Sequence, residues 1–290
     1  MEPASPPNGW PPRIRPLEYA GRMLRVAYNL LLKSSVQHDL YALIYGHPAV
    51  RHVRFMNYGH WPLPGGFLHD PAWAEESAQA GLYHRVLAEG AALLATPPRN
   101  LLEVACGRGG GARYAQALFP ETRLTVLDAQ PDAVLAAREV VAPARASVLV
   151  GSGAMLPFPE ASFDMVISVE AMMNLGRHAF LAECARVLRK GGAVSVSGFQ
   201  PCPGEELAPL LARDAAVSGL ELHSCQDITP AVLEACRVDQ QRREVALARG
   251  SRMGLSYMRN FAALPDTRTY RLFAEGKRCY FLARFTRPLK

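Results

Sequence analysis

The stretch LLEVACGRGGGARYA, residues 101–115, decides the fold of this chain. It begins as a short apolar run typical of a buried strand and passes into a turn crowded with Gly107, Gly109, Gly110 and Gly111 before a helical pattern follows. Glycines in such a turn can adopt positive φ and let a ligand approach the backbone, while the next helix offers free N–H groups. We therefore expect a strand, a turn and a helix that together bind a ligand.

The same alternation of apolar, β-branched runs and helical stretches continues along the chain. The runs alternate with helical patterns at residues 112–119, 132–141 and 178–189, which predicts an α/β protein with a parallel, doubly wound sheet covered on both faces. Two late runs can complete the sheet on either side of a long helical region at 230–263. The expected strands are LLEVA (101–105), RLTVLD (123–128), SVLV (147–150), FDMVISV (163–169), AVSVSGF (193–199), LELHSC (220–225) and CYFLARF (279–285).

Three regions are predicted from composition and periodicity. Residues 1–16 carry several prolines and are expected to form a disordered tail. Residues 17–95 are expected to hold N-terminal helices and a lid segment, with one or two amphipathic helices at 17–45 and another helix at 75–95. The apolar stripe of the first helices favours core packing over a membrane face. The core is predicted at 96–290, with a helical insertion at about 204–264.

Composition narrows the class of protein. The chain has 290 residues, 49% of them hydrophobic, and its net charge of +6 comes from basic residues scattered between acidic ones. No apolar stretch is long enough to cross a bilayer, and the first residues lack a basic segment followed by an apolar one. The six cysteines form no C-x-x-C pair or metal-ligand cluster. We expect a cytoplasmic protein with reduced thiols, no metal site, no stable membrane insertion and no nucleic-acid partner.

An acidic residue at the end of the second strand points to the kind of ligand. Asp128 follows the glycines by about 20 residues, where its carboxylate can accept hydrogen bonds from ribose hydroxyls. Strand, glycine turn and Asp128 together predict a nucleoside-containing cofactor. The turn reads E-V-A-C-G-R-G-G rather than the G-x-G-x-x-G of dinucleotide sites, and Glu103 suits a cation better than a pyrophosphate.

This turn resembles motif I of the class I S-adenosylmethionine (SAM) dependent methyltransferases, written E/D-x-G-x-G-x-G. The stretch GSGAMLPFPEASFDMVISVEAMMNLGRHAFLAECARVLRKGGAVSVSGF, residues 151–199, resembles the consecutive later motifs of that family. The resemblance implies a Rossmann-like, doubly wound, seven-stranded sheet with an N-terminal helical lid, and SAM as the cofactor. It implies that Glu103 helps to hold the methionine-ammonium end of SAM and that residues 152–155 reach the adenine.

Two positions depart from the family pattern. Ala105 replaces the usual first glycine of motif I, and Ser152 replaces the usual aspartate of the adenine loop, so the bond to the adenine lacks charge assistance. We expect SAM binding to persist in weaker form. The cofactor-binding residues that the resemblance implies are Tyr58, Trp61, Glu103, Ala105, Cys106, Gly107, Gly109, Asp128, Ala129, Ser152, Gly153, Ala154, Met155 and Glu170.

The segment RFMNYGHWP, residues 54–62, resembles the NYGYW segment of a subset of these enzymes. The subset includes methyltransferases of polyketide, macrolide and glycolipid biosynthesis, such as the phthiotriolone methyltransferases. The resemblance implies that Tyr58 and Trp61 enclose the cofactor and that His60 lies at the rim; the alternative is ordinary packing of a lid. The stretch DITPAVLEACRVDQQRREVALA, residues 227–248, resembles the helical part of the same subset, and an apolar lid suits a small hydrophobic acceptor such as a polyketide or lipid.

Methyl transfer to oxygen usually needs a base, and three residues are candidates for a catalytic role. Glu170 ends the fourth strand at the carboxyl edge of the sheet, where ligands bind in such folds, and it can act as a base or as a cofactor contact. His178 and His60 are the other candidates, with surface or capping roles as the alternatives, and His223 is expected to be structural. The subset favours a hydroxyl acceptor over carbon or nitrogen.

Two rival functions follow from the same residues. A SAM-fold cyclase or isomerase that no longer methylates is consistent with the departures at Ala105 and Ser152. A nucleic-acid methyltransferase would carry a basic stripe and an N-P-P-Y-like segment after the fourth strand, where VEAMMN stands instead.

Overall fold

A computed structural model gives the structure of the chain and describes residues 44, 50, 52–201, 204–249 and 255–290. The predicted tail at 1–16 and the helices at 17–43 lie outside the described residues. The described chain folds around a seven-stranded sheet in the order β3-β2-β1-β4-β5-β7-β6. Strand β7 is antiparallel to both of its neighbours, and the pairs among β1 to β5 are parallel.

Seven apolar runs of the sequence form the seven strands. Their bounds are β1 Asn100–Val104, β2 Arg123–Asp128, β3 Ala146–Val150, β4 Phe163–Val169, β5 Leu188–Gln200, β6 Glu221–Asp227 and β7 Cys279–Thr286. Most central strand residues are buried, because helices cover both faces of the sheet. The prediction of an α/β, doubly wound sheet with seven strands is confirmed.

Successive residues of a strand point to opposite faces, and this divides the core in two. On one face Leu101, Val126 and Ile167 pack with α3 (Ser77–Ala91), α4 (Gly110–Leu118), α5 (Pro131–Val140) and α9 (Thr229–Val238). On the other face Leu102 and Val166 pack with α6 (Met172–Leu175), α7 (Arg177–Val187) and α8 (Gly204–Val217). Two short 3₁₀ helices, η2 (Ala74–Glu76) and η3 (Pro143–Arg145), precede α3 and β3.

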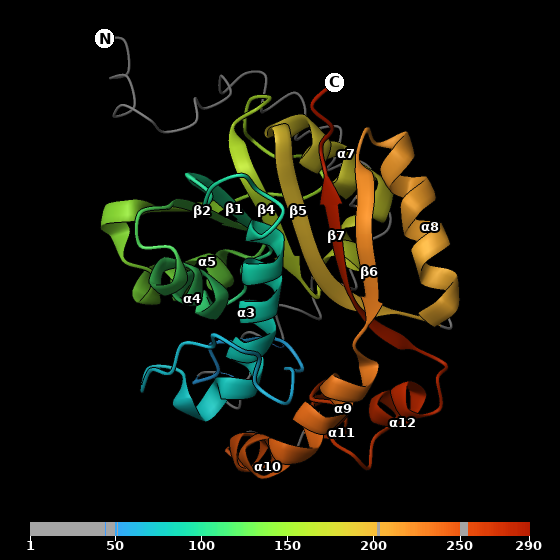
Figure 1. Ribbon diagram of the computed structural model, residues 1–290. Helices are drawn as coiled ribbons and strands as arrows, with labels where there is room; N and C mark the ends of the chain where they lie inside the picture. Colours follow the sequence, from blue (N-terminus) through green and yellow to red (C-terminus); the bar gives the residue numbers. More distant parts are fainter. Residues whose placement is uncertain (1–43, 45–49, 51, 202–203, 250–254) are drawn as a thin grey trace.

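The helical insertion lies between β6 and β7, and its described residues form four helices. These are α9, α10 (Gln240–Ala248), α11 (Leu255–Phe261) and α12 (Arg268–Ala274), and we call them the cap. Figure 1 shows the cap at the same end of the sheet as the chain around residues 52–76, the end where the parallel strands finish. Both segments are therefore placed over the carboxyl edge, where open α/β sheets bind ligands.

Two predicted boundaries are corrected. The insertion expected at 204–264 begins with α8, which packs against β6 and β7 as part of the core, so the cap spans 229–274 instead. The helix expected at 75–95 within the lid is α3, which contacts β4, β5 and β7 and also belongs to the core. In both cases the amphipathic pattern indicates that one face of the helix is buried, but it does not indicate which element packs against that face.

Candidate active site

The turn after β1 is built from residues with left-handed backbone. Ala105, Gly107 and Gly109 have φ of 60°, 53° and 81°, and Gly109 caps the N-terminus of α4. Cys106 is buried, and its N–H donates to the carbonyl of Leu127 at 3.1 Å. The turn therefore joins the ends of β1 and β2 and leads into α4, which packs on one face of the sheet.

Gly110 and Gly111 serve packing rather than a ligand. A Cβ on Gly110 would lie 2.7 Å from the carbonyl oxygen of Arg54, and one on Gly111 would lie 2.0 Å from the ring of Tyr83. The space that these glycines leave is thus filled by the segment before η2 and by α3. Our expectation of close ligand approach is restricted to the first part of the turn.

Glu103 is a buried carboxylate with one free oxygen. It lies on β1 with no exposed surface, its Oε1 accepts from the Tyr83 hydroxyl at 2.8 Å, and its Oε2 has no hydrogen-bond partner among the described residues. Burial raises the pKa of the carboxyl to about 8, despite the Tyr83 bond that lowers it. An uncompensated buried carboxylate is costly, and a ligand cation would satisfy Oε2. The residue thus fits the ammonium group of SAM.

Asp128 holds the glycine turn from the end of β2. Its Oδ2 accepts from the Gly107 N–H and its Oδ1 from the Gln130 N–H, both at 2.9 Å. Burial raises the pKa of this carboxyl, although these backbone bonds oppose the shift. Each carboxylate oxygen can accept a further bond, so Asp128 can still receive ribose hydroxyls. The next residue, Ala129, is exposed.

The loop expected to reach the adenine is closed by its own polar groups. The Ser152 Oγ accepts from the Ala154 N–H at 3.3 Å, and Ser152 and Met155 form an isolated bridge. A Cβ on Gly153 would lie 2.6 Å from Val104, so only glycine lets the loop lie against β1. Ser152 thus supports the loop, and its hydroxyl keeps a proton to donate elsewhere.

Glu170 follows β4 and is held in a strained conformation. Its φ is 57°, which is uncommon for a residue other than glycine and is often found at functional sites. Its Oε1 accepts from the Tyr58 N–H at 2.8 Å and from the Tyr280 hydroxyl at 2.6 Å. No hydrogen bond reaches its Oε2 from the residues that the structure describes. Burial raises the pKa of this carboxyl to about 7, while the bonds from Tyr280 and Tyr58 and the charge of Arg243 act against that rise.

Tyr58 was expected in the site from the sequence, whereas Tyr280 and Arg243, which complete the surroundings of Glu170, were not. Arg243, on α10, donates to the Tyr58 carbonyl at 2.7 Å and to Asp239 at 2.9 Å. The Tyr58 ring packs beside Phe199, Phe273 and Tyr280. These residues come from segments far apart in the chain, so no local pattern connects them.

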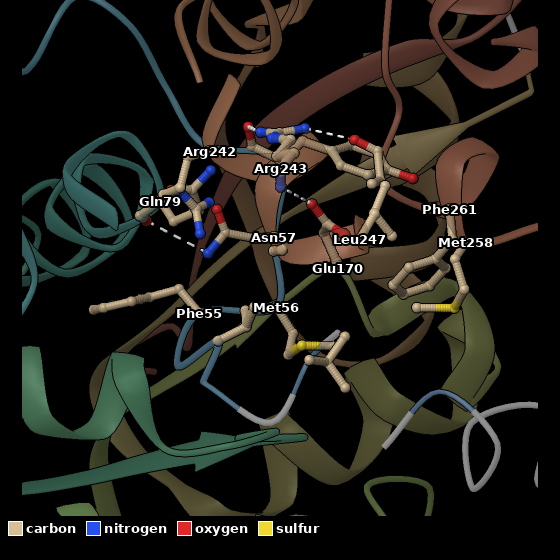
Figure 2. Close-up of a pocket in the computed structure, with 15 residues that line it drawn as sticks. Phe55, Met56, Asn57, Gln79, Glu170, Arg242, Arg243, Leu247, Met258 and Phe261 are labelled. Carbon is tan, nitrogen blue, oxygen red and sulfur yellow. Dashed lines mark hydrogen bonds between the residues drawn. The ribbon is translucent and has the colours of Figure 1, made fainter. Parts of the chain in front are cut away.

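A cavity of about 90 Å³ opens at this point between the chain before η2 and the cap (Figure 2). Figure 2 shows Gln79 and Arg242 on one side and Met258 and Phe261 on the other, with Glu170 between them. Most of its wall is apolar, and its polar groups gather near Glu170. Its lining consists of Val50, Val53, Phe55, Met56, Asn57, Tyr58, Gln79, Glu170, Arg242, Arg243, Ala246, Leu247, Met258, Phe261 and Ala262.

The histidines expected near the site lie elsewhere. His60 is buried, with Nδ1 3.0 Å from the Pro62 carbonyl and Nε2 3.0 Å from Arg85, so both ring nitrogens are engaged. His178 is 61% exposed and faces Asp214 of α8 at 3.5 Å, and His223 is exposed on β6. None of the three lines the cavity, so we leave them out of the proposed chemistry.

Trp61 also lies apart from the cavity, whereas Tyr58 lines it. The backbone N–H of Trp61 donates to the Ala231 carbonyl of α9 at 3.1 Å, so this residue joins the segment before η2 to the cap. Of the aromatic residues expected to enclose the cofactor, the structure thus places Tyr58 beside Glu170 and Trp61 against α9.

Comparison with known proteins finds similarity to methyltransferases. Residues 102–196 match the methyltransferase domain model Methyltransf_11. The chain is 33% identical over 54% of its length to a protein of Mycobacterium ulcerans described as "probable phthiotriol/phenolphthiotriol dimycocerosates methyltransferase 2". It is 34% identical over 61% of its length to a fatty-acid O-methyltransferase of Mycolicibacterium smegmatis. The aligned regions span 59% and 65% of these relatives.

The fold matches solved structures over most of the chain. The geranyl diphosphate C-methyltransferase of Streptomyces coelicolor, solved with S-adenosyl-L-homocysteine, has a TM-score of 0.61 and 18% identity, covering 88% of this chain and 99% of that one. At this identity the likeness concerns the fold. In the described part of the chain, no helix combines the length and apolar character needed to cross a membrane.

Proposed function

We propose that this chain is a class I methyltransferase that transfers a methyl group from SAM to an oxygen of a small hydrophobic acceptor. The observation that carries the proposal is Glu170, which lines an apolar cavity at the carboxyl edge of the sheet and whose Oε2 has no hydrogen-bond partner among the described residues. The domain match and the methyltransferase relatives favour this function over a SAM-fold cyclase or isomerase.

Three residues support the cofactor part of the proposal. Oε2 of Glu103, which has no partner among the described residues, suits the ammonium group, Asp128 suits the ribose hydroxyls, and Gly107 turns the backbone between them with positive φ. When bound, SAM supplies a methyl group on a positively charged sulfur.

Glu170 supports the proposal that the methyl acceptor is a hydroxyl group. As the new carbon–oxygen bond forms and the carbon–sulfur bond breaks, the acceptor hydroxyl must lose its proton, and Oε2 of Glu170 takes it. A base with a pKa of about 7 is half ionised at neutral pH, and it can take up and release a proton readily. The bonds from Tyr58 and Tyr280 fix the carboxylate, so that Oε2 keeps one direction.

The cavity wall supports a hydrophobic acceptor. Phe55, Leu247, Met258 and Phe261 offer an apolar surface that excludes water and aligns the acceptor, and alignment accounts for much of the acceleration in displacement reactions. The flexible side chains of Met56 and Met258 can adapt to irregular apolar shapes.

The first test is SAM-dependent methylation of hydroxylated lipids, followed as formation of S-adenosylhomocysteine and of the methyl ether. We expect Glu170→Gln to lower kcat on the order of 10²- to 10⁴-fold with little change in SAM affinity. Glu234→Gln, an exposed position in the cap, is the matched control and should leave kcat unchanged.

The pH profile adds an independent check. Glu170 acts in its ionised form, so kcat should fall as pH drops through about 7 and level off above it. SAM binding without any turnover would overturn the proposal and favour the non-methylating alternative. Full activity of Glu170→Gln would overturn the role of the base.

A further inference from the structure

Gln79, on α3, carries a hydrogen-bonding atom that nothing in the described protein uses. The residue is 2% exposed and lines the same cavity as Glu170. Its Nε2 donates to Asp239 Oδ2 at 2.8 Å, whereas its Oε1 is buried without a partner among the described residues. Figure 2 places Gln79 across the cavity from Phe261 and Met258.

The orientation of this amide is fixed by its neighbour. Asp239 accepts hydrogen bonds from Arg242 on both carboxylate oxygens and from Arg243 on Oδ2. Burial alone would raise the pKa of Asp239, but the bonds and charges of the two arginines lower it below its ordinary value. Asp239 is therefore an ionised acceptor, so the Gln79 side chain must present its NH₂ to it. The carbonyl Oε1 is then the atom left without a donor.

A buried carbonyl oxygen without a donor is rare, and it costs free energy that a bound donor recovers. The neighbouring arginines bond to other acceptors, Arg243 to Tyr58, Ala262 and Asp239, and Arg242 to Asp239, and no donor of the described residues reaches Gln79 Oε1. The Asn57 amide donates to the Gln79 backbone carbonyl at 3.4 Å rather than to Oε1. A donor on a bound ligand would supply the hydrogen bond that Oε1 lacks.

We propose that Gln79 Oε1 accepts a hydrogen bond from a second hydroxyl of the acceptor, so that the substrates are hydrophobic molecules with two hydroxyls close together. This inference rests on the proposed function, because it places the reacting hydroxyl at Glu170. Gln79 and Glu170 line the same cavity, so one acceptor can meet both residues, and the apolar wall can hold the rest of the molecule. Gln79 is then the residue that determines specificity for the diol.

The test compares 1,3-hexadecanediol with 3-fluoro-1-hexadecanol, which has similar size but lacks the second donor. Binding is measured by calorimetry on the full chain saturated with S-adenosylhomocysteine, and turnover is measured with SAM. We expect the diol to bind, and to react by kcat/KM, on the order of 10- to 100-fold better than the fluoro compound, because a site with an unmet polar group rejects a ligand that cannot pair with it.

Gln79→Met should remove this preference while leaving the affinity for S-adenosylhomocysteine unchanged. The control is Gln241→Met, at an exposed position of α10, which should keep the preference. The comparison of the two ligands on the unmodified protein needs no variant, so it holds even where Gln79→Met folds poorly.

Equal binding and turnover of the two compounds by the unmodified protein would overturn this inference alone. A preference that persists in folded Gln79→Met would also overturn it. Absence of transfer to either compound, with cofactor bound, would overturn the proposed function together with this inference.

Discussion

Ala105 shows how one residue accommodates a change in a glycine motif. Its φ of 60° is the left-handed conformation that the glycine of motif I would adopt freely. A methyl side chain can enter this region, but at a cost of about 1–2 kcal/mol. The turn therefore keeps its shape, and the departure appears as strain rather than as a blocked site.

We expect Ala105→Gly to raise the free energy of unfolding by about 0.5–1 kcal/mol, because relief of strain exceeds the added entropy of the unfolded chain. Urea denaturation of the two proteins measures this difference in the free energy of unfolding. Ala161→Gly, at a second position of positive φ, is the matched control and should change in the same direction. If Ala105→Gly lost stability while Ala161→Gly gained it, the backbone at Ala105 would not be strained.

We expect Glu103 to couple SAM binding to the release of a proton. Its pKa of about 8 means that the carboxyl is mostly protonated in the free protein at pH 7, whereas a bound ammonium group favours the ionised form. Binding of SAM at pH 7 should therefore release close to one proton. The affinity should rise as pH increases from 6 to 7, where the ammonium group of SAM keeps its charge.

Calorimetric titration in two buffers of different ionisation enthalpy measures this release. Glu103→Gln should abolish it and weaken binding, while Glu121→Gln, at an exposed position, should leave it intact. Equal heats in the two buffers for the unmodified protein would show that Glu103 does not meet the cation.

At the scale of elements, Arg243 of α10 fastens the cap to the segment before η2. It is 7% exposed and donates hydrogen bonds to Asp239, which caps the start of α10, to the carbonyl of Ala262 just after α11, and to the carbonyl of Tyr58. Tyr58 in turn donates to Glu170, so one cation connects the cap with the proposed base.

Arg243→Met should lower the free energy of unfolding by about 3–5 kcal/mol, because it leaves Asp239 and the Tyr58 carbonyl without this buried partner. Chemical denaturation measures the loss. Arg237→Met, which breaks an exposed pair with Glu234, should cost less than about 1 kcal/mol. Equal effects of the two variants would mean that the buried network does not hold the cap.

In folded Arg243→Met the pH profile of kcat should also move. The charge of Arg243 lowers the pKa of Glu170, so its removal should raise that pKa and shift the profile to higher pH. An unchanged pH profile would show that the charge of Arg243 does not influence the pKa of the proposed base, Glu170.

At the scale of the whole molecule, the proposed cofactor lies between the core and the segments over its carboxyl edge, so its binding should stabilise the entire fold. At 100 times its Kd, SAM should add about 2.7 kcal/mol, which corresponds to roughly 5–10 °C in Tm for a chain of this size. Differential scanning fluorimetry measures the shift. Glu103→Gln should lose most of it, and no shift in the unmodified protein would contradict the cofactor assignment.

The sequence by itself determined the sheet, the glycine turn and the ends of the strands that hold Glu103, Asp128 and Glu170. These features follow from local patterns, because side-chain alternation, apolar runs and glycine turns act over a few residues. The sequence also showed that Ser152 and Ala105 depart from the family pattern, but it did not show how they affect the backbone.

The tertiary structure alone decided what surrounds Glu170. Its partners Tyr58 and Tyr280 lie 112 and 110 residues away, and Arg243 lies 185 residues from the Tyr58 carbonyl that it holds. Packing at such separations sets which polar atoms meet and which, like Gln79 Oε1, remain unpaired. The histidines His60 and His178 looked equally suitable in the sequence, and only the fold placed Arg85 and Asp214 beside them, away from the cavity.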